Sequence, residues 1–485
     1  MKPSVCFVTA ELAPHAKAGG LADVSAALTQ ILHQRGHDLL TVLPLHAALD
    51  RQGIALEPVD ALAGLSLRLG SRLFHYSILR GRRAPGLPDL MLVDCPSLYD
   101  RPGLYDSGAD EHLRFLLLSH AALEACRRLR FAADILHCND WHTALLPLHL
   151  EAARATEPFF SGTRSVLSIH NLGYQGVFPY SLAGDLGPAA ALLDAGEAAQ
   201  GRINFLREGI VHADAVSTVS PTYAREICTP ELGMGLDGAL RARGEAVVGI
   251  LNGVDTDTWD PRRDSYLPFP YSPEDMTGKA RMREVLCKRL GLDPDRARPL
   301  VGMVTRLAWQ KGIDLLFDVL PDALSRGEIS LVVLGSGDAG HEEFLSRLAA
   351  DHRSAAAYRR GYDEELAHWI EAGCDAFLMP SRYEPCGLNQ MYSQRYGTVP
   401  VVRRTGGLAD SVQHFDPLTG QGTGIVFNDP DAGAVRWALG QMRRLYADRP
   451  AWARMVANGM AQDFSWDTAA DGYLDVYAQA ASRRR

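Results

Sequence analysis

The sequence predicts an α/β protein with two domains of similar design. Short apolar runs rich in β-branched residues alternate with longer segments that carry apolar residues at three- and four-residue spacing, which is typical of a parallel sheet covered by helices. The alternation restarts after a stretch without strong periodicity at about 255–272, which we interpret as a linker. The pentapeptide Gly-Gly-Leu-Ala-Asp occurs in both halves, at 19–23 and 406–410. We therefore expect two Rossmann-like domains that meet near residue 254.

The first half is expected to contain parallel strands separated by helices. Two segments, 21–35 and 111–129, have the clearest helical spacing. The expected strands are 5–10, 39–43, 134–137, 165–170 and 215–219.

The second half repeats the pattern, with a helix expected from about residue 312. Its expected strands are 300–304, 330–334, 376–379 and 399–402. Aromatic and aliphatic residues recur at helical spacing in 466–481, and we interpret them as the packing face of a closing helix rather than a ligand site. The expected domains are 1–253, with the helix 466–485 packing back on it, and 254–465. Ligands of such sheets bind at the carboxyl ends of the strands, so an interdomain cleft is the expected site.

Composition excludes several classes of function. The chain has 485 residues, of which 47% are hydrophobic and 22% charged, as in globular proteins. Its formal net charge of −9 argues against nonspecific nucleic-acid binding, and no apolar run approaches a membrane span. Eight cysteines lack metal-ligand spacing and are typical of reduced thiols. We expect a cytoplasmic protein without nucleic-acid or membrane partners, whose first residues form a strand rather than a signal peptide.

The two Gly-Gly-Leu-Ala-Asp turns are predicted anion sites. Each follows an apolar run and a basic residue, Lys17 or Arg404, and each opens a helical segment. A glycine pair at such a turn lets backbone N–H groups converge at a helix N-terminus. The pair of turns therefore indicates one anionic ligand held by two domains.

A cationic pair is expected at the mouth of the second sheet. Arg306 follows the strand 300–304, and Lys311 precedes the expected helix. A guanidinium and an ammonium at this position can neutralise a diphosphate leaving group, aided by the helix N-terminus. The alternative is that both are ordinary solvated cations.

A carboxylate, Glu384, follows the strand 376–379 and precedes a proline and glycine turn. It could accept hydrogen bonds from sugar hydroxyls or stabilise a developing oxocarbenium ion. The alternative is a carboxylate that caps a helix. Cys386 is as well explained as a small wall of the pocket as by any reactivity.

Polar residues also close two strands of the first half. His137 ends one strand and is followed by Asp140 and His142, and His170 ends the next strand. Their spacing does not match a helical zinc site, so we expect no metal. The alternatives are a helix N-cap for Asp140 and, for His170, a core histidine bonded to backbone.

Taken in order, these motifs resemble those of the bacterial glycogen synthases and plant starch synthases, which are retaining GT-B glucosyltransferases of family GT5. Together they span nearly the whole chain. The matching stretches are KAGGLADV (17–24), NDWH (139–142), HNLGYQG (170–176), NGVD (252–255), RLAWQKG (306–312), RYEPCGL (382–388), RRTGGLAD (403–410) and GTGIVF (422–427).

The resemblance implies that ADP-glucose donates glucose to the non-reducing end of an α-1,4-glucan such as glycogen, with retention and release of ADP. It implies that Arg306 and Lys311 bind the diphosphate and that Glu384 holds glucose hydroxyls. Asp140 and His170 would line the donor-sugar and acceptor side. No cofactor or metal is expected, because Arg and Lys replace the divalent ion.

The remaining residues of the implied site bind the substrate. Lys17 and its glycine turn would approach the diphosphate and sugar, while the turn at 405–407 would cover them with backbone amides. Tyr362 would stack on the adenine, and Asn252 would lie near the hinge and the sugar pocket. The expected substrate-binding set is Lys17, Gly19, Gly20, Asn252, Tyr362, Cys386, Gly387, Leu388, Thr405, Gly406 and Gly407.

The sequence departs from the family pattern at Ala18, where threonine is usual, and sibling families carry a second glutamate where this chain has Tyr392. We therefore expect front-face attack, with the leaving phosphate accepting the acceptor's proton, rather than a covalent intermediate. Three alternatives remain: a related enzyme that uses UDP-glucose or a phosphorylated acceptor, a glucan phosphorylase, and a noncatalytic glucan-binding protein.

Overall fold

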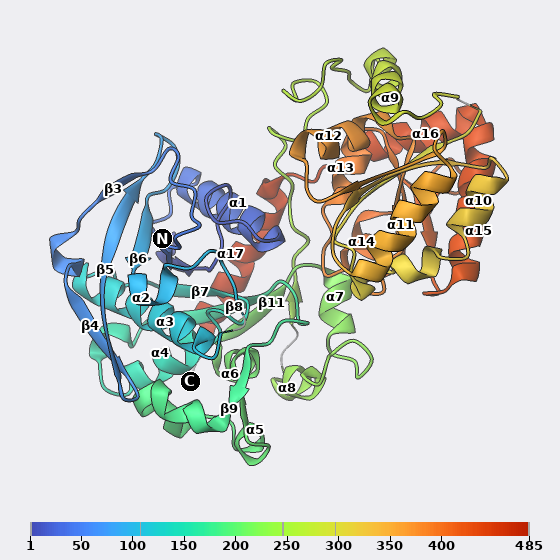
Figure 1. Ribbon diagram of the computed structural model, residues 1–485. Helices are drawn as coiled ribbons and strands as arrows, with labels where there is room; N and C mark the ends of the chain where they lie inside the picture. The colour runs from blue at the N-terminus through green and yellow to red at the C-terminus, as the bar shows by residue number, and fades with distance from the viewer. Residues whose placement is uncertain (1, 107, 245–246, 296, 484–485) are drawn as a thin grey trace. The chain divides into compact units, whose positions relative to one another are not determined.

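The computed structural model describes residues 2–106, 108–244, 247–295 and 297–483. The chain divides into two compact units (Figure 1). The first contains Met1–Val219, Ala224–Gly253 and Trp466–Arg485, and the second contains Ser220–Tyr223 and Val254–Ser465. The inclusion of Ser220–Tyr223 in the second unit was not predicted from the sequence.

The first unit is built on a mixed sheet in which a parallel array is extended by an antiparallel edge. The strand order is β12-β11-β8-β7-β1-β2-β6-β5-β3, and β4 pairs with β5. The parallel strands are β1 (Val5–Val8), β2 (Leu39–Pro44), β6 (Leu90–Asp94), β7 (Ile135–Asn139), β8 (Arg164–Ile169), β11 (Ala215–Thr218) and β12 (Val248–Gly249). The antiparallel strands are β3 (Ala55–Glu57), β4 (Leu65–Leu69) and β5 (Arg72–Arg82).

The expectation of a purely parallel first sheet is therefore wrong at this edge. Buried and exposed residues roughly alternate along β5, because only one of its faces packs against the core. Such a strand lacks the continuous apolar run by which the central strands are recognised. A separate antiparallel pair, β9 (Val177–Pro179) and β10 (Arg202–Asn204), completes the strands of this unit.

The closing helix α17 (Trp466–Ser482) completes the core of the first unit. Its residues Tyr473 and Tyr477 are buried in one apolar cluster with Phe7 of β1 and Leu28 of α1. The Tyr477 hydroxyl lies 2.7 Å from His137 Nδ1. The other helices of the first part of the chain are α1 (Gly20–Gln34), α2 (Pro96–Tyr99), α3 (Glu111–Arg128), α4 (Leu146–Arg154), α5 (Ala195–Ala199), α6 (Phe205–His212), α7 (Pro221–Glu226) and α8 (Asp237–Ala242).

The second unit is a parallel sheet with helices on both faces. Its order is β15-β14-β13-β16-β17-β18. Along β14, Leu331 and Val333 join one apolar cluster, while Val332 and Leu334 join another on the opposite face. The strands are β13 (Leu300–Val304), β14 (Ser330–Gly335), β15 (Ala356–Arg360), β16 (Ala376–Met379), β17 (Val399–Arg403) and β18 (Ile425–Phe427).

Two sets of helices cover the two faces of this sheet (Figure 1). One cluster draws on α10, α11, α15 and α16, and the other on α9, α12 and α14. The helices are α9 (Thr277–Leu290), α10 (Leu320–Ser325), α11 (Ala339–Asp351), α12 (Glu364–Gly373), α13 (Asn389–Arg395), α14 (Gly406–Ser411), α15 (Ala432–Ala447) and α16 (Arg449–Met460).

The sequence predicted an α-helix from about residue 312, but the segment after β13 does not form one there. Two short 3₁₀ turns, Trp309–Lys311 and Ile313–Leu316, flank Gly312, and the first α-helix is α10. Gly312 has a φ of +67°, and a Cβ there would lie 2.2 Å from the carbonyl oxygen of Pro380. The tight turn and the close approach both require glycine at this position. Because Lys311 ends a 3₁₀ turn and the next α-helix begins at Leu320, Lys311 is not placed at an α-helix N-terminus.

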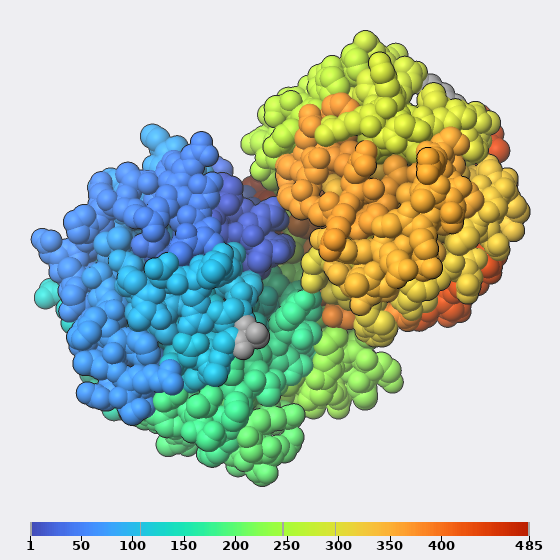
Figure 2. All heavy atoms as spheres, viewed as in Figure 1, coloured from blue at the N-terminus to red at the C-terminus, as the bar shows by residue number. Residues whose placement is uncertain are grey.

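The stretch 255–272 is part of the second unit and packs on its helices rather than forming a free linker. Trp259 lies between the rings of His368 and Tyr392, with centroid distances of 3.8 and 3.9 Å. The Tyr271 hydroxyl donates to the carbonyl of Tyr396. In Figure 2 the yellow-green atoms of this part of the chain lie directly against the orange atoms of the same unit.

Two absences concern only the residues that the structure describes. In the described ranges, no helix combines the length and the apolar character needed to cross a membrane. Within the same ranges, no disulfide joins two cysteines, and all but Cys228 are buried.

Candidate active site

An ion pair brings two predicted residues together at the end of the second sheet. The Lys311 ammonium lies 2.6 Å from Glu384 Oε2, and the two side chains are 18% and 7% exposed. Ser381 donates its hydroxyl to the same carboxylate oxygen at 2.9 Å. Arg306, a few residues before Lys311 in the sequence, is exposed, and its guanidinium lies 3.5 Å from Gln310 Oε1. Lys311 is therefore not an ordinary solvated cation.

The position of Glu384 also excludes the helix-cap alternative. The next helix, α13, begins at Asn389, and its N-cap residue is Leu388. Glu384 is buried, and its backbone carbonyl accepts the N–H of Gly407 at 3.1 Å. The carboxylate is therefore held by Ser381 of its own loop and by Lys311, while the glycine turn after β17 holds the Glu384 backbone.

The second Gly-Gly turn is packed against the loop that carries Glu384. A Cβ at Gly406 would lie 1.9 Å from the carbonyl oxygen of Glu384, and one at Gly407 would lie 2.0 Å from that of Cys386. Gly407 donates its N–H to the carbonyls of Glu384 and Pro385. These glycines are required by close packing inside the protein, and the Gly407 amide is already engaged there.

The first Gly-Gly turn has the opposite character. A Cβ at Gly19 or Gly20 would meet no atom within 4 Å, and Gly19 has an extended φ of −159°. Lys17 pairs with Asp23 at 2.8 Å, and the two side chains are 44% and 32% exposed. Internal packing does not require these two glycines, so their surroundings are open to a ligand. The two copies of the pentapeptide therefore have different structural roles.

Asp140 joins the ends of two neighbouring strands of the first sheet. Its φ of +56° is unusual for a residue other than glycine, and Oδ1 accepts the N–H groups of His170 at 2.7 Å and Asn171 at 3.3 Å. The N-cap alternative is wrong, because α4 begins only at Leu146. Burial raises the pKa of Asp140 to about 7.

The hydrogen bonds around His170 define its tautomer. Asn139 donates its amide Nδ2 to the carbonyl of Val8, so its Oδ1 faces His170 Nε2 at 3.0 Å and accepts the proton there. Among the residues described, His170 Nδ1 is buried without a hydrogen-bond partner. Burial lowers the pKa of His170 to about 4, which keeps the ring neutral. His170 therefore presents a lone pair on Nδ1, and its Nε2 partner is a side chain, not the backbone group of the core-histidine alternative.

The other histidines of this region serve packing. His137 lies between Tyr477 and Ser168, 2.7 Å from each hydroxyl, and His142 stacks on Tyr105. Within the ranges that the structure covers, no group of three or more His, Cys, Asp or Glu side chains could hold a metal ion.

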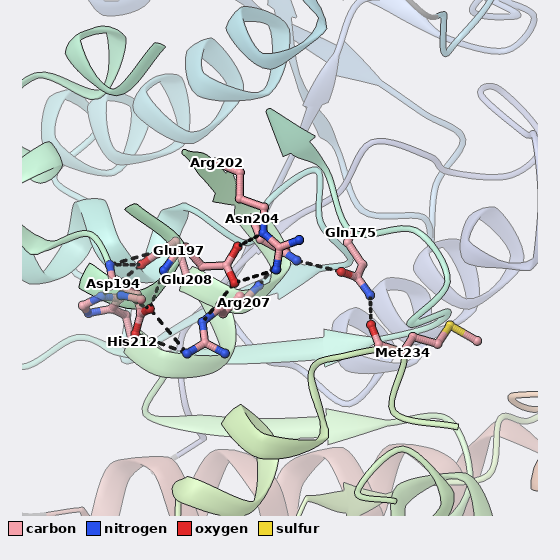
Figure 3. Close-up of polar contacts among 10 residues, drawn as sticks. Gln175, Asp194, Glu197, Arg202, Asn204, Arg207, Glu208, His212 and Met234 are labelled. Atoms are coloured by element: carbon pink, nitrogen blue, oxygen red, sulfur yellow. Dashed lines mark hydrogen bonds and ion pairs between the residues drawn. The ribbon is translucent and has the colours of Figure 1, made fainter. Parts of the chain in front are cut away.

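A polar network supports the loop that follows His170 (Figure 3). Gln175 donates to the carbonyl of Met234 at 3.0 Å and accepts from the Asn204 amide at 2.7 Å. Gly176 has a φ of +63°, and a Cβ there would meet the ring of Trp141 at 2.2 Å. Sequence reasoning had given Gln175 no role; the structure shows that it fixes this loop.

The remaining predicted residues are distributed over both units. Asn252 is buried, and its Oδ1 has no hydrogen-bond partner among the described residues. Tyr362, just after β15, is 70% exposed, which leaves its ring available for stacking. Cys386 and Thr405 are buried. Gly387 has a φ of +69° beside Leu388, the N-cap residue of α13.

Comparison with known proteins gives consistent matches along the chain. Residues 4–242 match the starch synthase catalytic domain, and residues 291–461 match the glycosyl transferases group 1 family. Glycogen synthase from Aromatoleum aromaticum is 45% identical over 98% of this chain and 96% of its own length. Glycogen synthase from Anaeromyxobacter dehalogenans strain 2CP-C is 44% identical over 98% and 99%. The chain belongs to the glycogen synthase family.

Solved structures agree with this membership of the glycogen synthase family. The catalytic domain of starch synthase IV from Arabidopsis thaliana, bound to ADP and acarbose, has a TM-score of 0.90 at 33% identity and covers all of both chains. Sucrose-phosphate synthase from Thermosynechococcus elongatus has a TM-score of 0.60 at 17% identity over 99% of each chain, which shows the fold alone. The two Rossmann-like domains are thus those of a GT-B fold, as predicted.

In this member of the glycogen synthase family, Tyr392 has a packing role. It is buried on α13 and stacks on Trp259 with an interplanar angle of 7°. The position at which sibling families carry a second glutamate is therefore filled by an aromatic ring in the core of the second unit.

Buried neutral histidines predict that the first unit of this glycogen synthase family member loses stability in acid. Burial lowers the pKa of four of its histidines to about 3 or 4: His46, His120, His137 and His170. The unfolded chain binds protons that the folded chain excludes, so this stability is complete above pH 6.5 and is lost as the pH falls towards 4. Each histidine contributes on the order of 3 kcal/mol to this loss of stability in acid. The raised pKa of Asp140 opposes part of the loss, because the folded chain binds that proton more tightly than the unfolded chain does.

Urea unfolding at several pH values between 7.5 and 4 measures this loss. The variant His137→Gln should show a shallower pH dependence than the wild type, because one of the excluded protons is removed. An identical dependence in the variant and the wild type would contradict the assignment.

Proposed function

We propose that the chain transfers glucose from ADP-glucose to the non-reducing end of an α-1,4-glucan such as glycogen, with retention of configuration and release of ADP. Membership of the glycogen synthase family makes the chain a glucosyltransferase. The observation that carries the proposal is the largely buried Lys311–Glu384 pair, because a diphosphate and a sugar need a fixed cation and a fixed hydrogen-bond acceptor side by side.

When the donor binds, Lys311 and Glu384 would exchange each other for partners on the donor. Without a ligand, the Glu384 carboxylate neutralises the Lys311 ammonium. When the diphosphate binds, Lys311 and Arg306 compensate its charge, and Glu384 is released to accept hydrogen bonds from glucose hydroxyls. Each group thus has a partner both before and after the donor binds.

The first unit would contribute a neutral acceptor. His170 Nδ1 is set by its tautomer to accept the hydrogen of a sugar hydroxyl. Asp140 holds the backbone before and after this ring in place through the N–H groups of His170 and Asn171. The open glycine turn at Gly19 and Gly20 and the Lys17 ammonium would approach the diphosphate of the same donor.

For the chemical step we propose front-face attack. The bond between the anomeric carbon and the diphosphate oxygen breaks, and the acceptor 4-hydroxyl bonds to that carbon from the same face. Its proton passes to the leaving phosphate, so no enzyme carboxylate needs to form a covalent bond. At the position where sibling families carry a second glutamate, this chain has Tyr392, whose ring stacks on Trp259. A glucosyl adduct trapped on any carboxylate would refute this step.

The test of the proposal is a matrix of donors and acceptors read out as release of nucleoside diphosphate. We expect ADP release that requires both ADP-glucose and glycogen. Preference for UDP-glucose or for a phosphorylated acceptor would redirect the substrate assignment. Absence of release with every pair would refute the proposed activity.

The same reaction is proposed to need no metal, since Arg306 and Lys311 supply the charge that a divalent ion supplies elsewhere. Incubation with excess EDTA should therefore leave the rate of ADP release within about twofold of the rate of the untreated enzyme. Recovery of a lost rate on adding Mg²⁺ would contradict this expectation.

The proposed setting is the cytoplasm, without nucleic-acid or membrane partners. The cysteines without disulfides, seven of the eight buried, suit a reducing compartment, and the net charge of −9 does not favour nonspecific binding to nucleic acid.

A further inference from the structure

A buried carboxylate lies beneath the open glycine turn of the first unit. Glu11 follows β1 after two residues and is 4% exposed. Its Oε2 accepts the backbone N–H of Ala18 at 2.8 Å and that of Gly19 at 2.9 Å. The chain therefore returns seven and eight residues later to the side chain of the residue at which the loop began.

The other oxygen of this carboxylate is also bonded. Tyr105 donates its hydroxyl to Glu11 Oε1 at 2.6 Å, and its ring stacks on His142. Hydrogen bonds to a carboxylate are stronger than those between neutral groups, and burial strengthens them further. Glu11 thus links the rigid end of β1, the loop 12–20 and the segment around Tyr105.

The two anchored amides lie between the groups that the proposed function uses. Lys17 precedes them and Gly20, the first residue of α1, follows them. The first N–H groups of an α-helix have no acceptor inside the helix. Their direction, and that of the Lys17 backbone, depends on how Ala18 and Gly19 are held. A Cβ at Gly19 or Gly20 would meet no atom within 4 Å, so no packed side chain supports these two positions directly.

The carboxylate also belongs to the surroundings of the proposed site. Its charge is one of the causes that raise the pKa of Asp140, which marks the two groups as electrostatic neighbours. No motif in the sequence had pointed to Glu11, because its partners are backbone amides.

We propose that Glu11 is a positioning residue for the donor, which holds the loop 17–20 in the shape that presents Lys17 and the first amides of α1 to the diphosphate. The proposal rests on the proposed function. Glu11 itself does not touch the donor; it acts through the Ala18 and Gly19 amides.

A competing arrangement makes the opposite prediction. If the Glu11 carboxylate occupied amides that the diphosphate must itself bind, its removal would free them and tighten the binding of ADP. The sign of the change in ADP affinity therefore separates the two arrangements.

The experiment compares the variants Glu11→Ala and Glu11→Gln with the wild type and with Tyr105→Phe. Loss of two charge-assisted bonds should raise the KM for ADP-glucose and the Kd for ADP, measured by calorimetry, by about tenfold or more in Glu11→Ala. The KM for glycogen should stay within about twofold. Glu11→Gln keeps one acceptor oxygen and should recover part of the affinity, while Tyr105→Phe leaves Oε2 on the loop and should change it less.

An unchanged Kd for ADP in both Glu11 variants, or a tighter one, would overturn the proposal. Circular dichroism and thermal melting check that Glu11→Gln, the isosteric change, is folded, so that a lost affinity is not a lost fold. Failure of the wild type to transfer glucose would refute the proposed function. The ADP affinities of the variants would still test the loop.

Discussion

Replacement of Lys311 by alanine is expected to lower the turnover number by roughly two to three powers of ten, because an electrostatic contact to the leaving group is lost. The ammonium is fixed 2.6 Å from Glu384, so the site is preorganised for charge that develops on the diphosphate. The substitution also leaves the buried Glu384 carboxylate without its cation. The measurement is kcat for ADP release at saturating ADP-glucose and glycogen.

The controls separate charge from stability. Lys288, an exposed lysine on α9 of the same unit, should tolerate alanine with its turnover unchanged. The double variant Lys311→Ala, Glu384→Gln removes the unpaired carboxylate and should recover stability without recovering turnover. Turnover at the wild-type level in Lys311→Ala would remove Lys311 from the mechanism.

Alanine at Gly407 is expected to destabilise the second unit by about 3 kcal/mol, which is at the upper end for an overpacked site. The added Cβ would lie 2.0 Å from the Cys386 carbonyl oxygen and 2.5 Å from its Cα, and backbone atoms cannot move aside as a side chain can. The loop that carries Glu384 would have to shift, so activity should fall with stability. Urea unfolding and ADP release measure the two effects.

Alanine at Gly19 is the matched control within the repeated pentapeptide. Its φ of −159° is accessible to any residue and its Cβ would meet nothing, so the unfolding free energy should stay within about 0.5 kcal/mol. The KM for ADP-glucose should rise if the turn approaches the diphosphate. Equal destabilisation by the two alanines would contradict the different roles assigned to the two turns.

The sequence predicted the fold best where strands are buried on both faces. β13 and β16 begin and end at the predicted residues, since each is a continuous apolar run. The antiparallel strand Arg72–Arg82 was missed because polar residues alternate along it. The helix expected from 312 failed for a different reason: the chain must turn at Gly312 beneath the Pro380 carbonyl, a contact between segments far apart in the sequence.

For the candidate site, the sequence located single residues but not their partners. Lys311 and Glu384 were each placed at a strand end, yet they lie 73 residues apart and no spacing rule pairs them. The helix-cap alternatives for Asp140 and Glu384 failed because the next helices begin several residues later. Glu11 escaped notice because backbone amides leave no mark in a sequence.

The packing of α17 on the first unit has a consequence for synthesis on the ribosome. The helix begins at Trp466, whereas the rest of that unit is complete at Gly253. At ~5–20 residues per second, the interval is roughly 10 to 40 s. Throughout it, the surface around Phe7 and Leu28 that Tyr473 and Tyr477 will cover stays uncovered in the nascent chain. The first unit to be translated is therefore the last to be finished, and chaperones that bind apolar surface have that interval in which to act.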